Sequence, residues 1–230
     1  MASTMAVKEV LKNVKIYENA IDKPGEPVSH ESRQEIGRGR SGIVYLHHDD
    51  DGSSLASKVF DSRGLTKAIQ WLFLGAPNPY MWNQDAVECA KIRRNILGLL
   101  VPFWTAGKVE VAGARAVVWN HAQTTFELQT RFVKGRAASL DHSLRTHRDD
   151  EAVNLWRRTM PALRKHLESA GFDGLLWQAG IGNPVALNNF LLEPVDRETQ
   201  TAGRKVSNER WIWIDLESGV PAIFPVSPKV

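Results

Sequence analysis

The stretch EIGRGRSGIVYLHHDDDGSSLASKVF, residues 35–60, reads as strand, glycine turn, strand, acidic turn and a third short strand. Gly37, Gly39 and Gly42 stand in a G-x-G-x-x-G frame, and Lys58 lies near the end of the stretch. Glycine lets a backbone come close to a phosphate group, so the hairpin is a candidate nucleotide site. The competing interpretation is a mobile surface turn with a lysine nearby.

Two features around the glycines favour the nucleotide interpretation. The glycines lie between two expected strands. This excludes the dinucleotide-binding fingerprint, which requires a strand followed by a helix, and leaves a glycine loop within a hairpin. Val44 can cover a nucleotide base, and Lys58 follows one hairpin later with apolar residues on both sides, an odd place for a solvated charge. We therefore expect Lys58 to contact phosphates.

Residues 85–100, DAVECAKIRRNILGLL, have the spacing of a helix. Asp85 is a candidate N-cap. The expected apolar face comprises Val87, Ala90, Ile92, Ile96 and Leu99. A phosphate-binding lysine needs an acidic partner on the next helix, and Glu88 is the first candidate and Asp85 the second. The alternative for Glu88 is a solvated surface carboxylate.

The following residues predict three strands, near 107–112, 114–121 and 125–133, and then a helix of about two dozen residues that ends at Gly171. Two short strands come last, in NNFLLEP and in RWIWIDLESG, with a polar loop at 195–209 between them. The order predicts a strand-rich part up to about residue 134 and a mainly helical part after it.

Asn189 precedes the first of these late strands, and Asp215 ends the second. In kinase sites an asparagine and an aspartate in this order hold magnesium against the nucleotide phosphates. The alternative is an asparagine in a turn and an aspartate that caps a turn. Glu217 either assists the metal or is exposed to solvent.

Taken in order, these motifs resemble the protein-kinase-like superfamily. GRGRSGIVY is similar to its glycine loop, ASKVF to its lysine strand, FELQTRFVKGRAASL to its hinge strand and exit, LRKHLESAGF to the long helix before the catalytic loop, and WIDLESG to its metal-binding segment. More closely, the chain resembles the PhoP regulatory network (YrbL-like) family, over roughly residues 33–225.

The resemblance implies an α+β, kinase-like bilobal fold with an antiparallel-sheet N-lobe and a truncated, mainly helical C-lobe. The implied divisions are a lead-in at 1–33, the N-lobe at 34–134 and a minimal C-lobe at 135–230. The implied ligands are ATP and Mg²⁺. Lys58 and Asp215 are then catalytic, and Asn189 and Asp215 hold the metal. The residues expected to bind the nucleotide are Gly37, Gly39, Gly42, Val44, Lys58, Glu88, Arg131 and Val133.

The chain departs from the kinase pattern at the catalytic loop. Kinases carry the catalytic aspartate of H-R-D five residues before the metal-binding asparagine, and counting back from Asn189 gives Pro184, while counting from Asn188 gives Asn183. Neither residue can accept a proton. The metal segment reads Asp-Leu-Glu, and only eleven residues follow Gly219, so we expect no activation segment.

Two functional hypotheses remain open. The first is an atypical kinase that transfers phosphate from ATP to an unknown protein or small-molecule acceptor. The second is a pseudokinase, a nucleotide-binding or scaffolding module that regulates a partner. Asp173 can be recruited as a substitute base, while His166 is expected to be packed or solvated.

Composition limits the other classes of function. The 230 residues carry a formal net charge of +3, too weak to indicate nucleic acid by itself. The basic groups Arg93–Arg94, Arg131–Lys134–Arg136 and Arg157–Arg158 fit an acidic partner or simple solvated faces. With Cys89 as the single cysteine, no secretory signal and no long apolar run, we expect a cytoplasmic protein without a membrane partner. The eight tryptophans are expected mainly in the core and in cleft walls.

Overall fold

The computed structural model describes residues 33–38, 42–49, 51–61, 68, 71, 78–138, 150–181, 186–194 and 209–217. These residues divide into two compact units. The first takes the described residues up to 99 together with 113–132, and the second takes 100–112 and 133–217. Residues 100–112 thus lie with the second unit although they fall inside the expected N-lobe, so the lobe boundaries stay a prediction.

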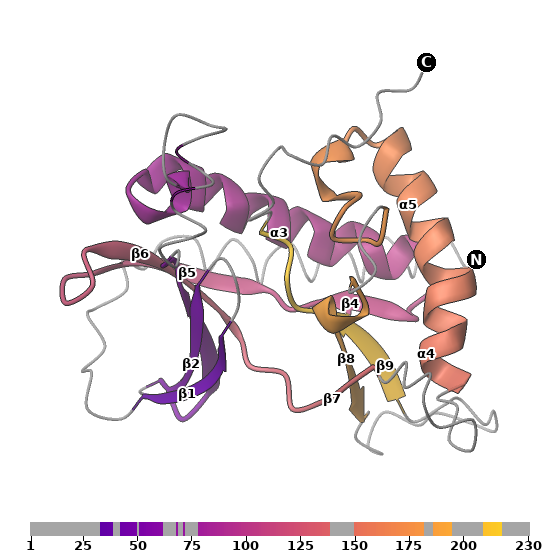
Figure 1. Cartoon of the computed structure of the whole chain (residues 1–230). Helices are drawn as coiled ribbons and strands as arrows, with labels where there is room; N and C mark the ends of the chain where they lie inside the picture. Colours follow the sequence, from indigo (N-terminus) through magenta and orange to yellow (C-terminus); the bar gives the residue numbers. More distant parts are fainter. Residues whose placement is uncertain are drawn as a thin grey trace. The chain divides into compact units, whose positions relative to one another are not determined.

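The first unit contains a five-stranded antiparallel sheet with the order β1-β2-β3-β6-β5 (Figure 1). Its strands are β1 (Gln34–Arg38), β2 (Ile43–His48), β3 (Ser54–Val59), β5 (Ala114–Asn120) and β6 (Thr125–Arg131). The three strands expected at the start of the chain are therefore confirmed, and β5 and β6 match the expected stretches 114–121 and 125–133. The expected mixed α+β class with an antiparallel sheet near the start of the chain is confirmed.

Helix α3 (Gln84–Trp104) follows a short 3-10 turn, η2 (Pro79–Met81). The expected helix is confirmed, but its N-cap is not Asp85. The side-chain Oδ1 of Asn83 accepts a hydrogen bond from the backbone N–H of Ala86 at 3.2 Å, which satisfies one of the free donors of the first turn. Asp85 lies inside that turn, where a carboxylate favours the positive end of the helix.

The buried face of α3 differs from the expected one. Val87 and Ala90 are buried as predicted, but the exposed fractions of Ile92 and Ile96 are 55% and 43%. The buried stripe comprises Val87, Ala90, Arg94, Leu97 and Val101. Its first part packs on the sheet, because Val87 shares an apolar cluster with Phe60, Ala114 and Leu128. Arg94 occupies a position that a sequence pattern assigns to an apolar residue.

The opposite face of the same sheet carries buried polar groups. Arg33 Nη1 and Asn120 Nδ2 both donate to Glu127 Oε1, at 2.6 and 2.5 Å. His47 Nδ1 lies 3.4 Å from Ser57 Oγ, and both residues are buried. The first group links the residue before β1 with β5 and β6, and the second links β2 with β3.

The second unit contains a four-stranded mixed sheet with the order β4-β9-β8-β7 (Figure 1). Its strands are β4 (Val109–Val111), β7 (Arg136–Ala137), β8 (Phe190–Pro194) and β9 (Glu209–Trp213). Strand β4 pairs with β9 in parallel, and the other two pairs are antiparallel. Ala112, Val133 and Ile212 form an apolar cluster on this sheet.

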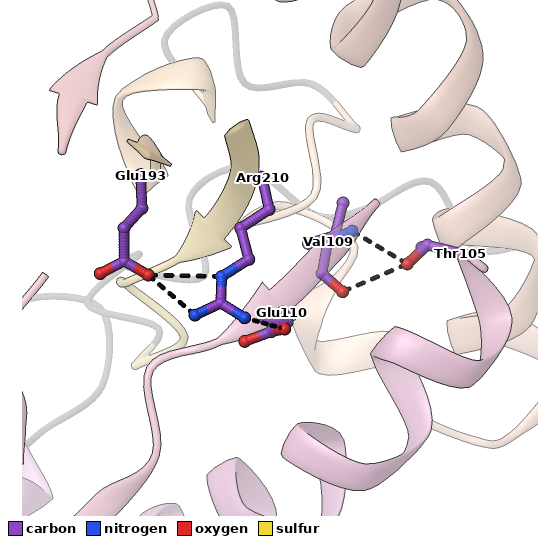
Figure 2. A network of polar contacts seen from close by, with 5 residues as sticks. All are labelled: Thr105, Val109, Glu110, Glu193 and Arg210. Atoms are coloured by element: carbon purple, nitrogen blue, oxygen red, sulfur yellow. Dashed lines mark hydrogen bonds and ion pairs between the residues drawn. The ribbon is translucent and has the colours of Figure 1, made fainter. Parts of the chain in front are cut away.

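Side chains reinforce the junction between β4, β8 and β9 (Figure 2). Arg210 on β9 donates to Glu110 on β4 at 2.6 Å and to Glu193 on β8 at 3.2 and 3.4 Å. Thr105, just after α3, donates to the carbonyl of Val101 at 2.8 Å and accepts from the N–H of Val109 at 3.1 Å. The threonine thus fixes the turn that leads from α3 into β4.

The long helix expected before Gly171 is present in three parts. They are α4 (Asp150–Asn154), a π-helical stretch η3 (Leu155–Thr159) and α5 (Met160–Ser169). Gly171 has φ 78°, and the N–H of Phe172 bonds the carbonyl of Leu167 at 2.8 Å. This is a Schellman-type C-cap, so the predicted helix end is confirmed. Two short 3-10 turns follow, η4 (Asp173–Leu175) and η5 (Ala186–Asn189).

Most tryptophans do not lie in the core. Trp211 and Trp213 are buried, but Trp71, Trp82 and Trp119 have exposed fractions of 59%, 57% and 36%. The expectation of tryptophans in the core is confirmed for Trp211 and Trp213 and wrong for these three, and the expectation of tryptophans in cleft walls stays a prediction.

Candidate functional site

The glycines of the first hairpin have different structural surroundings. A β-carbon at Gly42 would overlap the carbonyl oxygen of Val59 and lie 3.0 Å from its carbonyl carbon, whereas one at Gly37 would meet only Val44 Cβ at 4.0 Å. Gly42 is therefore needed for close packing against β3. Among the described residues, no packing contact requires glycine at position 37. A requirement for glycine there would therefore come from a ligand. Gly39 lies outside the described residues.

Lys58 and Val44 face the same side of the sheet in the first unit. Lys58 is paired directly with Val44 on β2 and with Leu128 on β6, and paired residues in antiparallel strands project to the same face. The side chain of Lys58 is half-buried, and its Nζ lies 5.8 Å from the centre of the Phe60 ring. This is the face against which α3 packs through Val87.

Glu88, the expected partner of Lys58, has an ion pair on its own helix. Its Oε2 lies 3.2 Å from Lys91 Nζ, at i,i+3 spacing. Glu88 is half-buried, while Asp85 is exposed. The exposed fractions of the Lys91 and Glu88 side chains are 12% and 35%, and helix pairs at this spacing are typically worth about 0.2–0.5 kcal/mol. The role of Glu88 toward Lys58 stays a prediction.

Asn189 and Asp215 lie at the same end of one strand pair in the second unit. Phe190, the first residue of β8, pairs with Trp213, the last residue of β9. The carbonyl of Asn189 accepts a hydrogen bond from the N–H of Ile214 at 2.8 Å, which places Asn189 beside the residue before Asp215. Both side chains are half-buried. The backbones of Asn189 and Asp215 thus lie at the same end of the β8–β9 pair.

The segment after β9 is held close to the sheet. The indole N–H of Trp213 donates to the carbonyl of Asp215 at 3.0 Å, and Leu216 and Glu217 are buried. The exposed-surface alternative for Glu217 is therefore wrong. Its part in metal binding stays a prediction.

The side chain of Asn189 is oriented by a residue that the sequence patterns missed. Asn189 Nδ2 donates to the Oε1 of Gln178 at 2.8 Å and to the carbonyl of Gln178 at 3.0 Å. Gln178 Nε2 in turn donates to the carbonyl of Glu217 at 3.0 Å. The only signal in the sequence was a polar amide within the apolar run LLWQAG.

The expected hinge residues fall in different units. Arg131 ends β6, and its N–H bonds the carbonyl of Gly113 at 3.0 Å. The side chain of Val133 is buried with Ala112 and Ile212 in the second unit. Any nucleotide contact at Val133 therefore falls to its backbone, and both residues stay predictions for nucleotide binding.

The two candidate substitutes for the missing base have ordinary surface positions. His166 is exposed, and its ring stacks on Trp104 at 5.5 Å between centres and 7° between planes. This agrees with the packed or solvated interpretation. Asp173 is exposed at the start of η4, and Pro184 and Asn183 lie outside the described residues.

The described residues limit the metal chemistry and the charge patterns. They include no group of three or more His, Cys, Asp or Glu side chains that could hold a metal. A magnesium ion that binds through nucleotide phosphates needs only one or two protein carboxylates, so it does not require a group of three. Arg94 is 1% exposed, so the Arg93–Arg94 pair is not a solvated basic face. Among the described residues, no helix has the length and apolar character to cross a membrane.

Comparisons with known proteins give a likeness to solved structures and none to known families or curated proteins. Among solved structures, the chain is similar to the kinase domain of maize SIRK1, sucrose-induced receptor kinase 1, bound to AMP-PNP, with 12% sequence identity and a TM-score of 0.40. The likeness covers 84% of this chain and 56% of that chain, and the YrbL-like resemblance stays a prediction.

Proposed function

We propose that the chain is an atypical kinase-like protein that binds ATP with Mg²⁺ and transfers phosphate to an acceptor of unknown identity. One observation supports this above the others: Asn189 and Asp215 lie at the same end of the β8–β9 pair. An amide and a carboxylate oxygen in that order are the protein ligands of the kinase metal site. The third-strand lysine in the first unit adds to the support.

Each proposed residue has a separate task. The backbone around Gly37 approaches the phosphates, Val44 covers the base, and the ammonium of Lys58 neutralises phosphate charge. Asp215 and Asn189 hold the metal. Mg²⁺ held by these two residues would supply positive charge against the phosphates during transfer.

A catalytically weak pseudokinase is the second candidate, and one observation favours it. The position five residues before Asn189 is Pro184, which cannot accept a proton. A positioned general base typically contributes a factor of about 10²–10⁴ in rate. Phosphoryl transfer depends mostly on positioning and charge neutralisation, so the loss slows transfer without removing nucleotide binding.

Thermal unfolding with and without ATP and Mg²⁺ tests the binding step. At about one hundred times the dissociation constant, a ligand stabilises the native state by about 2.7 kcal/mol, which raises Tm by about 5–10 °C for a chain of this size. Lys58→Met and Asp215→Asn should remove the shift. Lys108→Met and Asp150→Asn, which change exposed side chains, should keep it. No shift with millimolar nucleotide would contradict the proposal.

Phosphotransfer under single-turnover conditions separates the two candidates. Protein in excess over radiolabelled ATP is followed for ADP release and for label on the protein or on added acceptors. Turnover that Asp215→Asn removes supports the kinase. A Tm shift without turnover supports the pseudokinase. The cytoplasmic location and the absence of nucleic-acid and membrane partners stay part of the proposal.

A further inference from the structure

Gln178 is a buried amide that contacts both segments of the proposed metal site. It follows η4 in the chain, and its exposed fraction is 6%. Its side chain accepts from Asn189 Nδ2 at 2.8 Å and donates to the carbonyl of Glu217 at 3.0 Å. A single side chain thus connects the residue before β8 with the turn after β9.

The carbonyl of Glu217 determines the orientation of both amides. A backbone carbonyl can only accept a hydrogen bond, so the end of Gln178 that faces it must be the NH₂ group. The other end of Gln178 is then its carbonyl oxygen, which needs a donor. Asn189 must therefore present its NH₂ group to Gln178. The same NH₂ group also donates to the backbone carbonyl of Gln178.

This arrangement leaves Asn189 Oδ1 directed away from Gln178. The NH₂ group of Asn189 has two hydrogens, and the two bonds to Gln178 at 2.8 and 3.0 Å account for both. Of the two ends of the Asn189 amide, only the oxygen can bind a metal. Without Gln178, the amide could rotate by half a turn and present the NH₂ group instead.

We propose that Gln178 is a positioning residue that presents Asn189 Oδ1 to the metal and fixes the turn after Asp215. The inference rests on the proposed function for the metal and adds a residue that the kinase pattern does not assign. Groups that hold a metal ligand in place by hydrogen bonds typically change metal affinity by about 10–100-fold when they are replaced.

The test replaces Gln178 by methionine, which has a similar length and no hydrogen-bonding amide. Gln129→Met is the matched control, because Gln129 is also a buried glutamine, 4% exposed, and lies in the sheet of the first unit. The Mg²⁺ concentration that gives half of the ATP-dependent Tm shift should rise about 10–100-fold in Gln178→Met. It should stay unchanged in Gln129→Met.

A double-mutant cycle with Asn189→Ala tests whether Gln178 acts through Asn189. Once the amide of residue 189 is absent, the Gln178→Met change should have a much smaller effect on the Mg²⁺ midpoint, because contacting residues are not additive. A purely structural role would lower the Tm of the free protein and leave the Mg²⁺ midpoint unchanged. That result, or full additivity in the cycle, would overturn the inference.

A second readout does not depend on metal binding. The side-chain NH₂ protons of Asn189, assigned in NMR spectra by their loss in Asn189→Ala, should exchange slowly with water in the wild-type protein and in Gln129→Met. They should exchange rapidly in Gln178→Met. Rapid exchange in the wild type would overturn the positioning role. Slow exchange that Gln178→Met removes, in a protein that binds no Mg²⁺–ATP, would reject the proposed function and leave the orientation of Asn189 by Gln178 supported.

Discussion

Gly42 lies so close to Val59 that a β-carbon on the glycine would overlap the valine carbonyl oxygen. We therefore expect Gly42→Ala to lower the free energy of unfolding by about 1–3 kcal/mol, the usual cost of overpacking. Gly37→Ala should change it by less than about 0.5 kcal/mol, since the new methyl group meets only Val44. Urea unfolding of both variants measures the difference, and equal losses would contradict this explanation of Gly42.

Gly37→Ala also tests the role of the hairpin in binding. If the backbone at residue 37 approaches a phosphate, this variant keeps its stability and loses at least half of the Tm shift given by ATP and Mg²⁺. Gly52→Ala serves as a control, because Gly52 lies in the acidic turn. Gly52 has φ 79°, so alanine there is strained, and the Tm shift is measured relative to that variant's own free protein. A full shift in Gly37→Ala would leave the glycine pattern without a ligand-binding role at that position.

Glu88 and Lys91 share one ion pair, so their variants separate pairing from nucleotide binding. Glu88→Gln and Lys91→Gln both remove the 3.2 Å contact, and each should cost less than about 0.5 kcal/mol. Only Glu88→Gln should reduce the ATP-dependent Tm shift, because a carboxylate is needed to hold Lys58. Equal shifts in the two variants would remove Glu88 from the proposed site.

His47 makes the stability of the chain depend on pH. Burial lowers the pKa of His47, and the positive charge of Arg33 lowers it further, although Glu127 and Asp49 act in the opposite direction. Below the unfolded pKa of about 6.5, the unfolded chain binds a proton that the native chain does not. The stability contributed by neutral His47 is therefore present above about pH 6.5 and lost as the pH falls through the lower pKa of the folded state.

Urea midpoints at about pH 7.5 and pH 5.5 measure this effect, because the first pH lies above the unfolded pKa of His47 and the second lies below it. His47→Gln should make the midpoint less dependent on pH. His48→Gln is the control, because His48 is exposed on the opposite face of β2, where its Nδ1 lies 3.2 Å from Ser54 Oγ. The same pH dependence in His47→Gln and in the wild type would show that other groups cause it.

Thr105 offers a test of the turn into β4. Thr105→Val keeps the shape of the side chain and leaves the buried N–H of Val109 without its hydroxyl partner, a change that typically costs about 1–3 kcal/mol. Thr105→Ser keeps the hydroxyl and should recover most of that loss. Chemical denaturation of both variants checks the expectation, and equal stability of Thr105→Val and the wild type would contradict it.

The elements with a clear period or cap were predictable, and the burial of α3 was not. The hairpin strands, the helix end at Gly171 and the late strands follow local rules of alternation and capping. Which residues of α3 are buried depends on the side of the helix that packs against the sheet. Arg94, at 1% exposure, interrupts the apolar stripe, and Ile92 and Ile96 give a second stripe that tertiary packing leaves in solvent.

The same division holds for the candidate site. The β8–β9 pairing places Asn189 and Asp215 at the same end of two strands, while their joint role at a metal stays a prediction. Gln178 was not predictable, because its role comes from three hydrogen bonds to residues eleven and thirty-nine positions away. Such contacts have no local pattern. The ion pair of Glu88 with Lys91 was also missed, although i,i+3 spacing was visible in the sequence.

The parallel pairing of β4 with β9 has a consequence for folding during synthesis. The sheet of the first unit is complete once residue 131 is available, but β4 must wait for residues 211–213. At about 5–20 residues per second, the ribosome needs about 4–16 s to make the roughly eighty residues between the end of β6 and the residues of β9 that pair with β4. A nascent chain that stops before β9 should therefore show a protected first sheet and an unprotected β4, and the edge of β4 is then the part most open to chaperones and proteases.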